Sequence, residues 1–107
     1  GHDECAPISN RTKQFDEWVH VNLGSYADWC KAHNSLLIVT YDEDDFTSTN
    51  KIATVFYGAN VKTGTYTQTI NHNNVLRFLE DANGLSTHAG AAASAFGVFC
   101  GELMARC

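Results

Sequence analysis

A short apolar run that ends in a cluster of acidic residues constrains the fold of this chain most. Leu36 to Val39 is aliphatic and does not alternate with polar residues, which is typical of a strand covered on both faces. In open α/β sheets, ligands bind beyond the carboxyl ends of the strands. The run therefore predicts a central strand that ends on a functional rim, and the rim residues are Tyr41, Asp42, Glu43, Asp44 and Asp45.

The segment ahead of this strand has the spacing of a helix. From Lys13 to about His33, apolar residues recur at helical intervals, and Gly24 interrupts the pattern. We expect either one kinked helix or two short ones. The two tryptophans of this segment, Trp18 and Trp29, are expected in the core.

Two further β-type runs follow the central strand. Residues 52–58 predict a second strand, and the alternation from Thr65 to Ile70 predicts a strand with one exposed face. A strand of that kind lies at a sheet edge, where its unpaired backbone groups can bind another strand. We therefore expect a homodimer that forms through this edge, with a monomer as the alternative.

Polar residues with capping side chains mark the start of another helix. Asn71 to Asn74 offer N-cap groups, and Gly84 is a typical stop. Residues 85–94 are rich in Ala, Gly and Ser and predict a loop, whereas residues 96–107 return to helical spacing. The buried face of the first of these helices is expected to consist of Val75, Leu76, Leu79 and Ala82.

Helices before, between and after the strands indicate an α/β fold. The expected architecture is a small αβα sandwich with a mixed sheet. A chain of 107 residues has room for one domain, so we expect residues 1–107 to form a single domain.

The four cysteines form an even set that suits two disulfides in an oxidising compartment. Cys100 and Cys107 are seven positions apart, which on a helix separates their Cα atoms by about 10.5 Å. A disulfide bridges roughly 7 Å at most. We therefore expect Cys5 and Cys30 each to pair with one of the two C-terminal cysteines, and both connectivities remain open.

Charge and targeting signals indicate a secreted protein. Asn10 begins a glycosylation sequon, and no apolar run is long enough to insert across a membrane, so we expect a processed soluble protein. The formal net charge is -5, with seven Lys and Arg in total. This balance argues against binding to nucleic acid.

Four stretches of the sequence are familiar in their order and spacing: His33 to Asp45, Asn50 to Gly58, Val61 to Gly64 and Ile70 to Asp81. They resemble the C-terminal third of the phosphoesterase family, which includes secreted acid phosphatases and phospholipases C. The resemblance implies an αβα core like that of alkaline phosphatase and a bound divalent metal. It places Asp42 and Glu43 at acidic metal-site positions and His72 at a recurrent histidine. Family members are several hundred residues long and carry their nucleophile in portions that this chain lacks, which implies a partial site.

In size and architecture the chain also resembles small secreted lectins of ink-cap mushrooms. Sugars bind to carboxylates and amides, which take paired hydroxyls, and to aromatic rings that cover the face of the pyranose. We therefore favour a secreted protein that binds cell-surface glycans, without a cofactor and without catalysis. The candidate ligand-binding residues are Tyr41, Asp42, Glu43, Tyr57, Asn71, His72 and Asn73.

The alternative function is a metal-dependent phosphoesterase that acts at the Asp42 and Glu43 rim. Hard oxygen ligands from the acidic run, together with His72, suit Mg²⁺ or Ca²⁺. No motif nominates a nucleophile for such an enzyme. A solvated loop without any function is the structural alternative for the acidic run.

Overall fold

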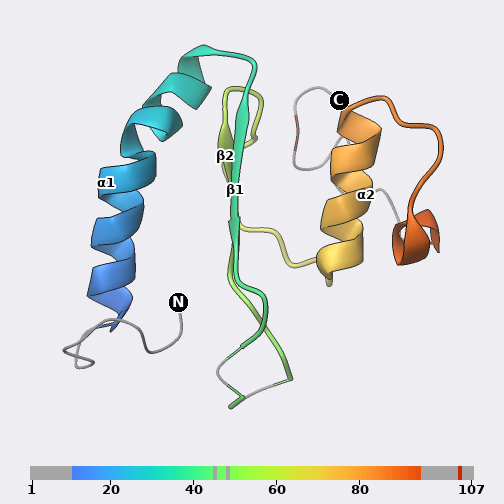
Figure 1. Ribbon diagram of the computed structural model, residues 1–107, viewed down its shortest axis with the longest axis horizontal. Coiled ribbons are helices and arrows are strands. Elements are labelled where there is room, and N and C mark those ends of the chain that lie inside the picture. Colours follow the sequence, from blue (N-terminus) through green and yellow to red (C-terminus); the bar gives the residue numbers. More distant parts are fainter. Residues whose placement is uncertain (1–10, 45, 48, 95–103, 105–107) are drawn as a thin grey trace. The chain divides into compact units, whose positions relative to one another are not determined.

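The computed structural model describes residues 11–44, 46–47, 49–94 and 104 (Figure 1). The described part contains helix α1 (Arg11–Ala32), strands β1 (Leu36–Thr40) and β2 (Thr54–Gly58), helix α2 (His72–Ala82) and the short 3₁₀ helix η2 (Gly90–Ser94). The α/β class predicted from the sequence is confirmed, because helices accompany a small sheet. In the described residues, neither α-helix has both the length and the hydrophobicity needed to cross a membrane.

The chain divides into two compact units. The first, Gly1–Ala59, contains α1, β1 and β2, and the second, Asn60–Cys107, contains α2 and η2. The single domain expected over residues 1–107 stays a prediction.

Helix α1 runs for 22 residues without a break. The predicted interruption at Gly24 is wrong, because one glycine costs about 1 kcal/mol relative to alanine, and the rest of the helix offsets this cost. Lys13 and Glu17 support the first half as an ion pair one turn apart, with 3.5 Å between Nζ and Oε1.

The tryptophans of α1 lie at the surface, and their predicted place in the core is wrong. Trp18 is 57% exposed and Trp29 is 47% exposed. Helix α1 packs against a sheet that has only two strands in the described residues. Trp29 instead stacks on His33, with 4.1 Å between ring centroids.

Strands β1 and β2 form an antiparallel pair. Leu36 lies opposite Gly58 and Thr40 lies opposite Thr54, whose hydroxyl oxygen is 2.8 Å from that of Thr40. Within the described residues β1 has no partner strand other than β2, so the predicted position at the centre of a sheet is not found. The side chains from Leu36 to Val39 are accordingly half-buried.

Residues 65–70 do not form the predicted edge strand. They have no regular secondary structure. The Tyr66 hydroxyl instead donates a hydrogen bond of 2.9 Å to the Lys62 carbonyl, four residues earlier. The sheet edge on which the expected homodimer depended is therefore not present as a strand.

Helix α2 begins and ends where the sequence predicts. Asn71 is its N-cap: the side-chain oxygen accepts hydrogen bonds from the backbone N–H groups of Asn73 and Asn74, and Asn74 Oδ1 accepts from the Asn71 N–H. The chain leaves the helix at Gly84, whose φ of 71° suits glycine best.

The buried face of α2 differs from the predicted one. The buried residues are Asn74, Phe78 and Glu80, whereas Leu76 and Leu79 are 41% and 42% exposed. Val75 is half-buried, and Ala82 is exposed. The predicted face of Val75, Leu76, Leu79 and Ala82 is wrong because α2 packs on η2 through a face that includes polar side chains.

The C-terminal segment contains one described residue, Met104, which forms an isolated antiparallel β-bridge with Val61. The predicted terminal helix is therefore wrong at Met104. The rest of the segment 96–107 lies outside the described part, as do Cys5, Cys100, Cys107 and Asn10. Cys30, for which we expected a disulfide, is a free and fully buried thiol in the structure.

The close approach of β2 to the start of β1 predicts that Gly58 cannot be replaced. A Cβ atom there would overlap the backbone oxygen of Ser35 and lie 3.2 Å from Leu36 Cα. Because these are backbone atoms of the first residue of β1 and of the residue before it, they cannot move aside without loosening the strand pair. We expect Gly58→Ala to lower the free energy of unfolding by about 2 kcal/mol or more, measured by urea denaturation.

Gly64→Ala is the matched control for this substitution. A Cβ at Gly64 would lie 3.6 Å from the Tyr66 ring, which is an ordinary contact. We expect a change within about 0.5 kcal/mol. Equal stabilities of the two variants would show that the strands are not this close.

Candidate functional site

The acidic rim begins where β1 ends. Tyr41, Asp42 and Glu43 follow Thr40 directly, and the Tyr41 ring packs against Phe15 of α1 with 5.4 Å between centroids. Asp42 Oδ1 accepts a 3.0 Å hydrogen bond from the backbone N–H of Glu43. The contact with Phe15 therefore ties the first residue of the rim to the helix.

An open groove leads to this rim between α1 and β1. Its volume is about 430 Å³, and most of its wall is apolar. Asp42 is the acidic residue among those that line the groove, and it lies two residues after the exposed end of β1. The lining residues are Phe15, Trp18, Val19 and Leu23 from the helix and Ile38 to Asp42 from the strand and rim.

Asp44 shapes the loop that follows the rim. One of its carboxylate oxygens accepts from the Phe46 N–H at 2.8 Å, and the other accepts from the Asn50 N–H at 2.9 Å. The Asn50 side-chain oxygen in turn accepts from the Asp44 N–H at 2.8 Å. We call this set of three bonds the Asp44 clamp. It commits both oxygens of Asp44 to backbone groups.

Tyr57 lies away from the rim, so the expectation that it shares a site with Asp42 is wrong. Because β1 and β2 are antiparallel, Tyr57 near the end of β2 is paired with Leu37 near the start of β1. Its ring is covered by the Lys31 ammonium group, 4.4 Å from the centroid. The prediction assumed strands whose carboxyl ends meet, which an antiparallel pair does not provide.

Asn71, His72 and Asn73 belong to the second unit and form the start of α2. The Asn71 side chain serves as the N-cap, and the Asn73 N–H donates to it at 2.9 Å. His72 is the first residue of the helix and is exposed. The part that Asn71 plays here is structural, since its side-chain oxygen is used by the helix backbone.

The rim offers carboxylates for a cation, but few of them. In the part of the chain that the structure describes, no three His, Cys, Asp or Glu residues come together as metal ligands. The Asp44 oxygens serve the clamp, and Asp45 lies outside the described residues. Asp42 and Glu43 remain as hard oxygen donors. This donor set fits Mg²⁺, which binds through one or two carboxylates and otherwise keeps waters and substrate phosphates.

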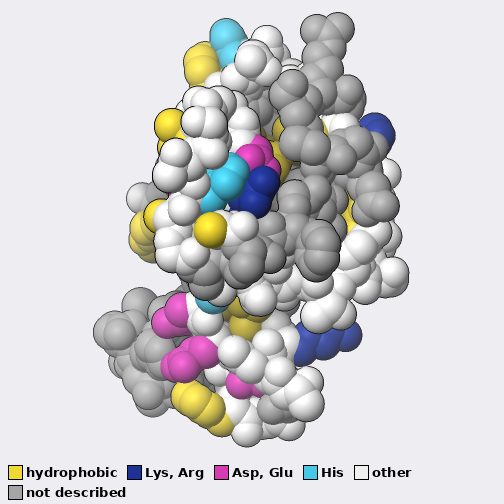
Figure 2. Space-filling model, turned by 90° about the vertical axis from the view of Figure 1, so that its right-hand side faces the viewer, with side chains coloured by type: hydrophobic (Ala, Val, Ile, Leu, Met, Phe, Trp, Pro, Cys, Tyr) yellow, Lys and Arg dark blue, Asp and Glu magenta, His cyan; other side chains and the backbone are white. Residues whose placement is uncertain are grey.

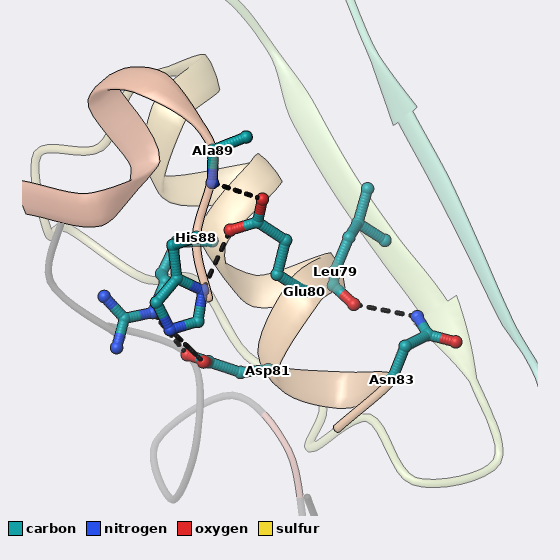
Figure 3. Close-up of polar contacts among 7 residues, drawn as sticks. Leu79, Glu80, Asp81, Asn83, His88 and Ala89 are labelled. Atoms are coloured by element: carbon teal, nitrogen blue, oxygen red, sulfur yellow. Dashed lines mark hydrogen bonds and ion pairs between the residues drawn. The ribbon is translucent and has the colours of Figure 1, made fainter. Parts of the chain in front are cut away.

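A second polar cluster, in the second unit, escaped the sequence analysis (Figure 3). His88 lies between two carboxylates: its Nδ1 is 2.9 Å from Glu80 Oε2, and its Nε2 is 3.4 Å from Asp81 Oδ1. The other oxygen of Glu80 accepts from the Ala89 N–H at 2.9 Å. Arg77 Nε donates to both oxygens of Asp81, at 2.9 and 3.0 Å.

This cluster ties the end of α2 to the segment before η2. Both ring nitrogens of His88 face carboxylates of α2. Glu80 is buried, and a buried carboxylate is costly unless its oxygens are hydrogen-bonded. The helical spacing of Arg77 and Asp81 could have been recognised in the sequence, whereas the contact of Glu80 with His88 crosses a loop and leaves no pattern.

The buried thiol of Cys30 lies on α1, one helical turn after Tyr26. A side-chain hydrogen bond with Cys30 raises the pKa of Tyr26 above its usual value. The Tyr26 ring also stacks on Trp29, with 5.8 Å between centroids. None of these groups lines the groove that leads to the rim.

Comparison with known proteins identifies the family. The model of the Phosphoesterase family matches residues 2–86. The chain belongs to the phosphoesterase family. Over 72 residues this phosphoesterase chain is 57% identical to a phosphatidylinositol-3-phosphatase of Mycobacterium tuberculosis. These residues are 67% of the chain and 24% of the relative, so the chain spans about a quarter of the relative's length.

The family predicted from the four sequence stretches is therefore confirmed, and the glycan-binding interpretation is wrong. A bacterial phosphatase with 57% identity overturns the lectin, the carbohydrate ligand and the fungal character inferred from size and architecture. No solved structure matches the phosphoesterase chain.

The position of His88 predicts that its loss destabilises the second unit. In His88→Ala, the buried Glu80 carboxylate keeps the bond from Ala89 but loses the imidazole. Leaving a buried group without one of its partners costs about 1–3 kcal/mol. We expect a decrease of this size in the free energy of unfolding, measured by urea denaturation.

The control is His20→Ala, since His20 is an exposed residue of α1. Substitutions at exposed positions change stability by within about 0.5 kcal/mol. If both alanine variants were as stable as the unchanged protein, His88 would not hold the buried carboxylate in solution.

Proposed function

We propose that this chain takes part in the hydrolysis of phosphate monoesters and that the Asp42 and Glu43 rim faces the reacting phosphate. The observation that carries the proposal is the 57% identity to a phosphatase over two thirds of the chain. The groove between α1 and β1, with Asp42 at one end, supports the placement. This function replaces glycan binding.

The negative charge of the rim means that a phosphate can bind there only together with a cation. The chain has a formal net charge of -5, and a phosphate monoester is itself an anion. Two adjacent carboxylates therefore repel a phosphate unless a positive charge lies between them. A divalent cation such as Mg²⁺ supplies this charge when bound, and it polarises the phosphoryl oxygens.

The surrounding residues hold the rim in place. Tyr41 packs on Phe15, and the Asp42 carboxylate bonds the next backbone N–H. The Asp44 clamp closes the loop immediately afterwards. Asp42 and Glu43 are thus positioned by groups on both sides, and positioning is what a phosphoryl-transfer site chiefly requires of its protein.

The relative's name supports a proposal for the substrate class. Its name describes an enzyme that acts on the 3-phosphate of phosphatidylinositol. We infer that this chain acts on the same class of substrate, a phosphate monoester on the headgroup of an inositol lipid. The apolar wall of the groove supports a substrate that also has apolar parts.

The rim carboxylates provide the test. In Asp42→Asn and Glu43→Gln the side chains keep their size but lose the charge that attracts the cation. We expect the affinity for inorganic phosphate in the presence of Mg²⁺, measured by isothermal titration calorimetry, to fall about tenfold or more in each variant, because the charge that holds the cation is removed. Removal of Mg²⁺ by EDTA should cause a similar loss of phosphate binding in the unchanged chain.

Asp28→Asn is the matched control for a change in net charge. Asp28 is an exposed acid on α1, outside the groove and the rim. Its affinity for phosphate should equal that of the unchanged protein. Unchanged phosphate affinity in Asp42→Asn, or no phosphate binding by the unchanged chain in the presence of Mg²⁺, would contradict the proposal.

A further inference from the structure

Strand β1 has one edge that no other strand of the described residues covers. The sheet consists of β1 and β2 there, so β2 takes one edge of β1 and leaves the other open. Five consecutive residues, from Ile38 to Asp42, line the groove beside α1. Successive residues of a strand point to opposite faces, so a lining without gaps indicates that the groove follows the open edge. The backbone groups of such an edge can pair with a further strand.

The exposed apolar side chains of α1 lie on the side of this open edge. Trp18 lines the groove although it is 57% exposed. Val21 and Trp29 follow it at three and eleven positions, which places them along the same side of the helix. They are 77% and 47% exposed. We call these three residues the apolar stripe. The stripe and the open strand edge together form a surface of the kind that binds protein.

A second copy of this chain matches the strand edge and the stripe at once. Two β1 edges that join antiparallel about a two-fold axis give one sheet of four strands, in the order β2, β1, β1, β2. An axis perpendicular to the sheet keeps both helices on the same face. Because α1 contacts both strands of its own copy, the two helices are then separated by two strand spacings, about 9.6 Å. Packed helices lie about 8–10 Å apart, so the two copies of α1 can contact each other.

The middle of β1 sets the expected register of the two copies. With Ile38 opposite Ile38 of the second copy, the whole strand from Leu36 to Thr40 is paired. Leu23 is about midway between Trp18 and Trp29, and it borders the groove together with Ile38. The two-fold axis therefore passes near the middle of the apolar stripe. Trp18 of each copy then approaches the partner's Trp29.

Charge favours the antiparallel arrangement of the two strands. Asp42, Glu43 and Asp44 follow the end of β1, and Figure 2 shows acidic side chains gathered at the lower end of the view, where this loop lies. In the antiparallel pair the two acidic rims are separated by about 27 Å of strand. The Debye length is about 8 Å at physiological salt, so their repulsion is screened. Each rim instead meets the start of the partner's β1, which follows Lys31 and His33.

We propose that two copies of this chain form a dimer through the open edges of β1 and that each copy contributes His33 to the acidic rim of the other. Counted outward from Ile38, the residue opposite Glu43 is the partner's His33. Its Nδ1 lies 2.8 Å from the Trp29 carbonyl oxygen, so Nε2 is the ring nitrogen that faces the rim. An imidazole there can donate a hydrogen bond to a phosphate oxygen. Only this role rests on the proposed function.

Sedimentation equilibrium of the full chain at micromolar concentrations tests the dimer. We expect a species with twice the mass of the chain. In Trp18→Glu and in Val21→Glu a charge replaces an exposed side chain of the stripe, so we expect the dissociation constant to rise at least about tenfold. Because both positions are more than half exposed, circular dichroism should show an unchanged fold. A single-chain mass at every concentration overturns the dimer.

Leu85→Glu is the matched control for the added charge. Leu85 is 54% exposed, close to the value for Trp18, but it belongs to the second unit and lies outside the groove. Its dissociation constant should stay within about twofold of that of the unchanged protein. An equal rise in Leu85→Glu and Trp18→Glu would show that the dimer does not form through the stripe.

A cross-link tests the contact of His33 with the rim. The double variant His33→Cys, Glu43→Cys has a thiol beyond each end of β1, and the strand alone spans about 14 Å. A disulfide bridges roughly 7 Å at most, so oxidation should join two copies, seen as a covalent dimer on a non-reducing gel. The control pair is His20→Cys, Glu43→Cys, since His20 lies outside the groove. Equal amounts of covalent dimer in the two pairs would refute the contribution of His33.

The dimer and the proposed function fail in different ways. Sedimentation and cross-linking need no phosphate, so a dimer that binds no phosphate removes the proposed function and leaves the interface standing. A monomer whose phosphate binding depends on Asp42 removes the dimer and leaves the proposed function standing.

Discussion

The antiparallel pairing of β1 with β2 is the interaction on which the first unit depends. The ladder runs from Leu36 opposite Gly58 to Thr40 opposite Thr54, and α1 packs against this pair. Everything between Thr40 and Thr54 is therefore a loop closed by the last pair of the ladder. The acidic rim and Phe46 both lie in that loop, so their positions follow from the register of two short strands.

Neighbouring acids in this loop have different roles, although they are identical in type. Asp44 uses both oxygens to hold backbone N–H groups, whereas Asp42 lines the groove and accepts a hydrogen bond from the N–H of the next residue through Oδ1. A carboxylate that already accepts two backbone bonds has less capacity to attract a cation. The different roles of Asp42 and Asp44 depend on how the backbone turns after Glu43. A run of four acidic residues in the sequence does not show where that turn lies.

Local signals in the sequence predicted β1 and α2, but they also predicted a strand at residues 65–70 that the structure does not contain. The asparagine cap at Asn71, the stop at Gly84 and the aliphatic run of β1 act within a few residues of the structure they specify. The family motifs were recognisable for the same reason, because they are continuous. The direction of β2 relative to β1 was not recognisable in this way, because it depends on how the two strands pair in the folded chain. The sequence analysis therefore placed Tyr57 at the wrong end of the sheet.

Burial was harder to predict than secondary structure. The buried face of α2 contains the charged Glu80, whose partners His88 and Ala89 come eight and nine positions later, after the helix has ended. Hydrophobic spacing alone favours Leu79 over Glu80 for that face. Only the contacts between elements show that the Glu80 carboxylate has hydrogen-bond partners. In the same way, only the structure shows that the tryptophans of α1 are exposed beside a sheet of two described strands.

The free thiol of Cys30 can be used to measure how often the packing of the first unit opens. The side chain is fully buried on the helix that packs against β1 and β2, so a thiol reagent reaches it only when that packing opens. The rate at which Cys30 is alkylated in the native protein therefore measures how often α1 separates from the sheet. The proposed binding of phosphate and a cation at the end of β1 would then be detected, without any enzymatic assay, as a slowing of that reaction.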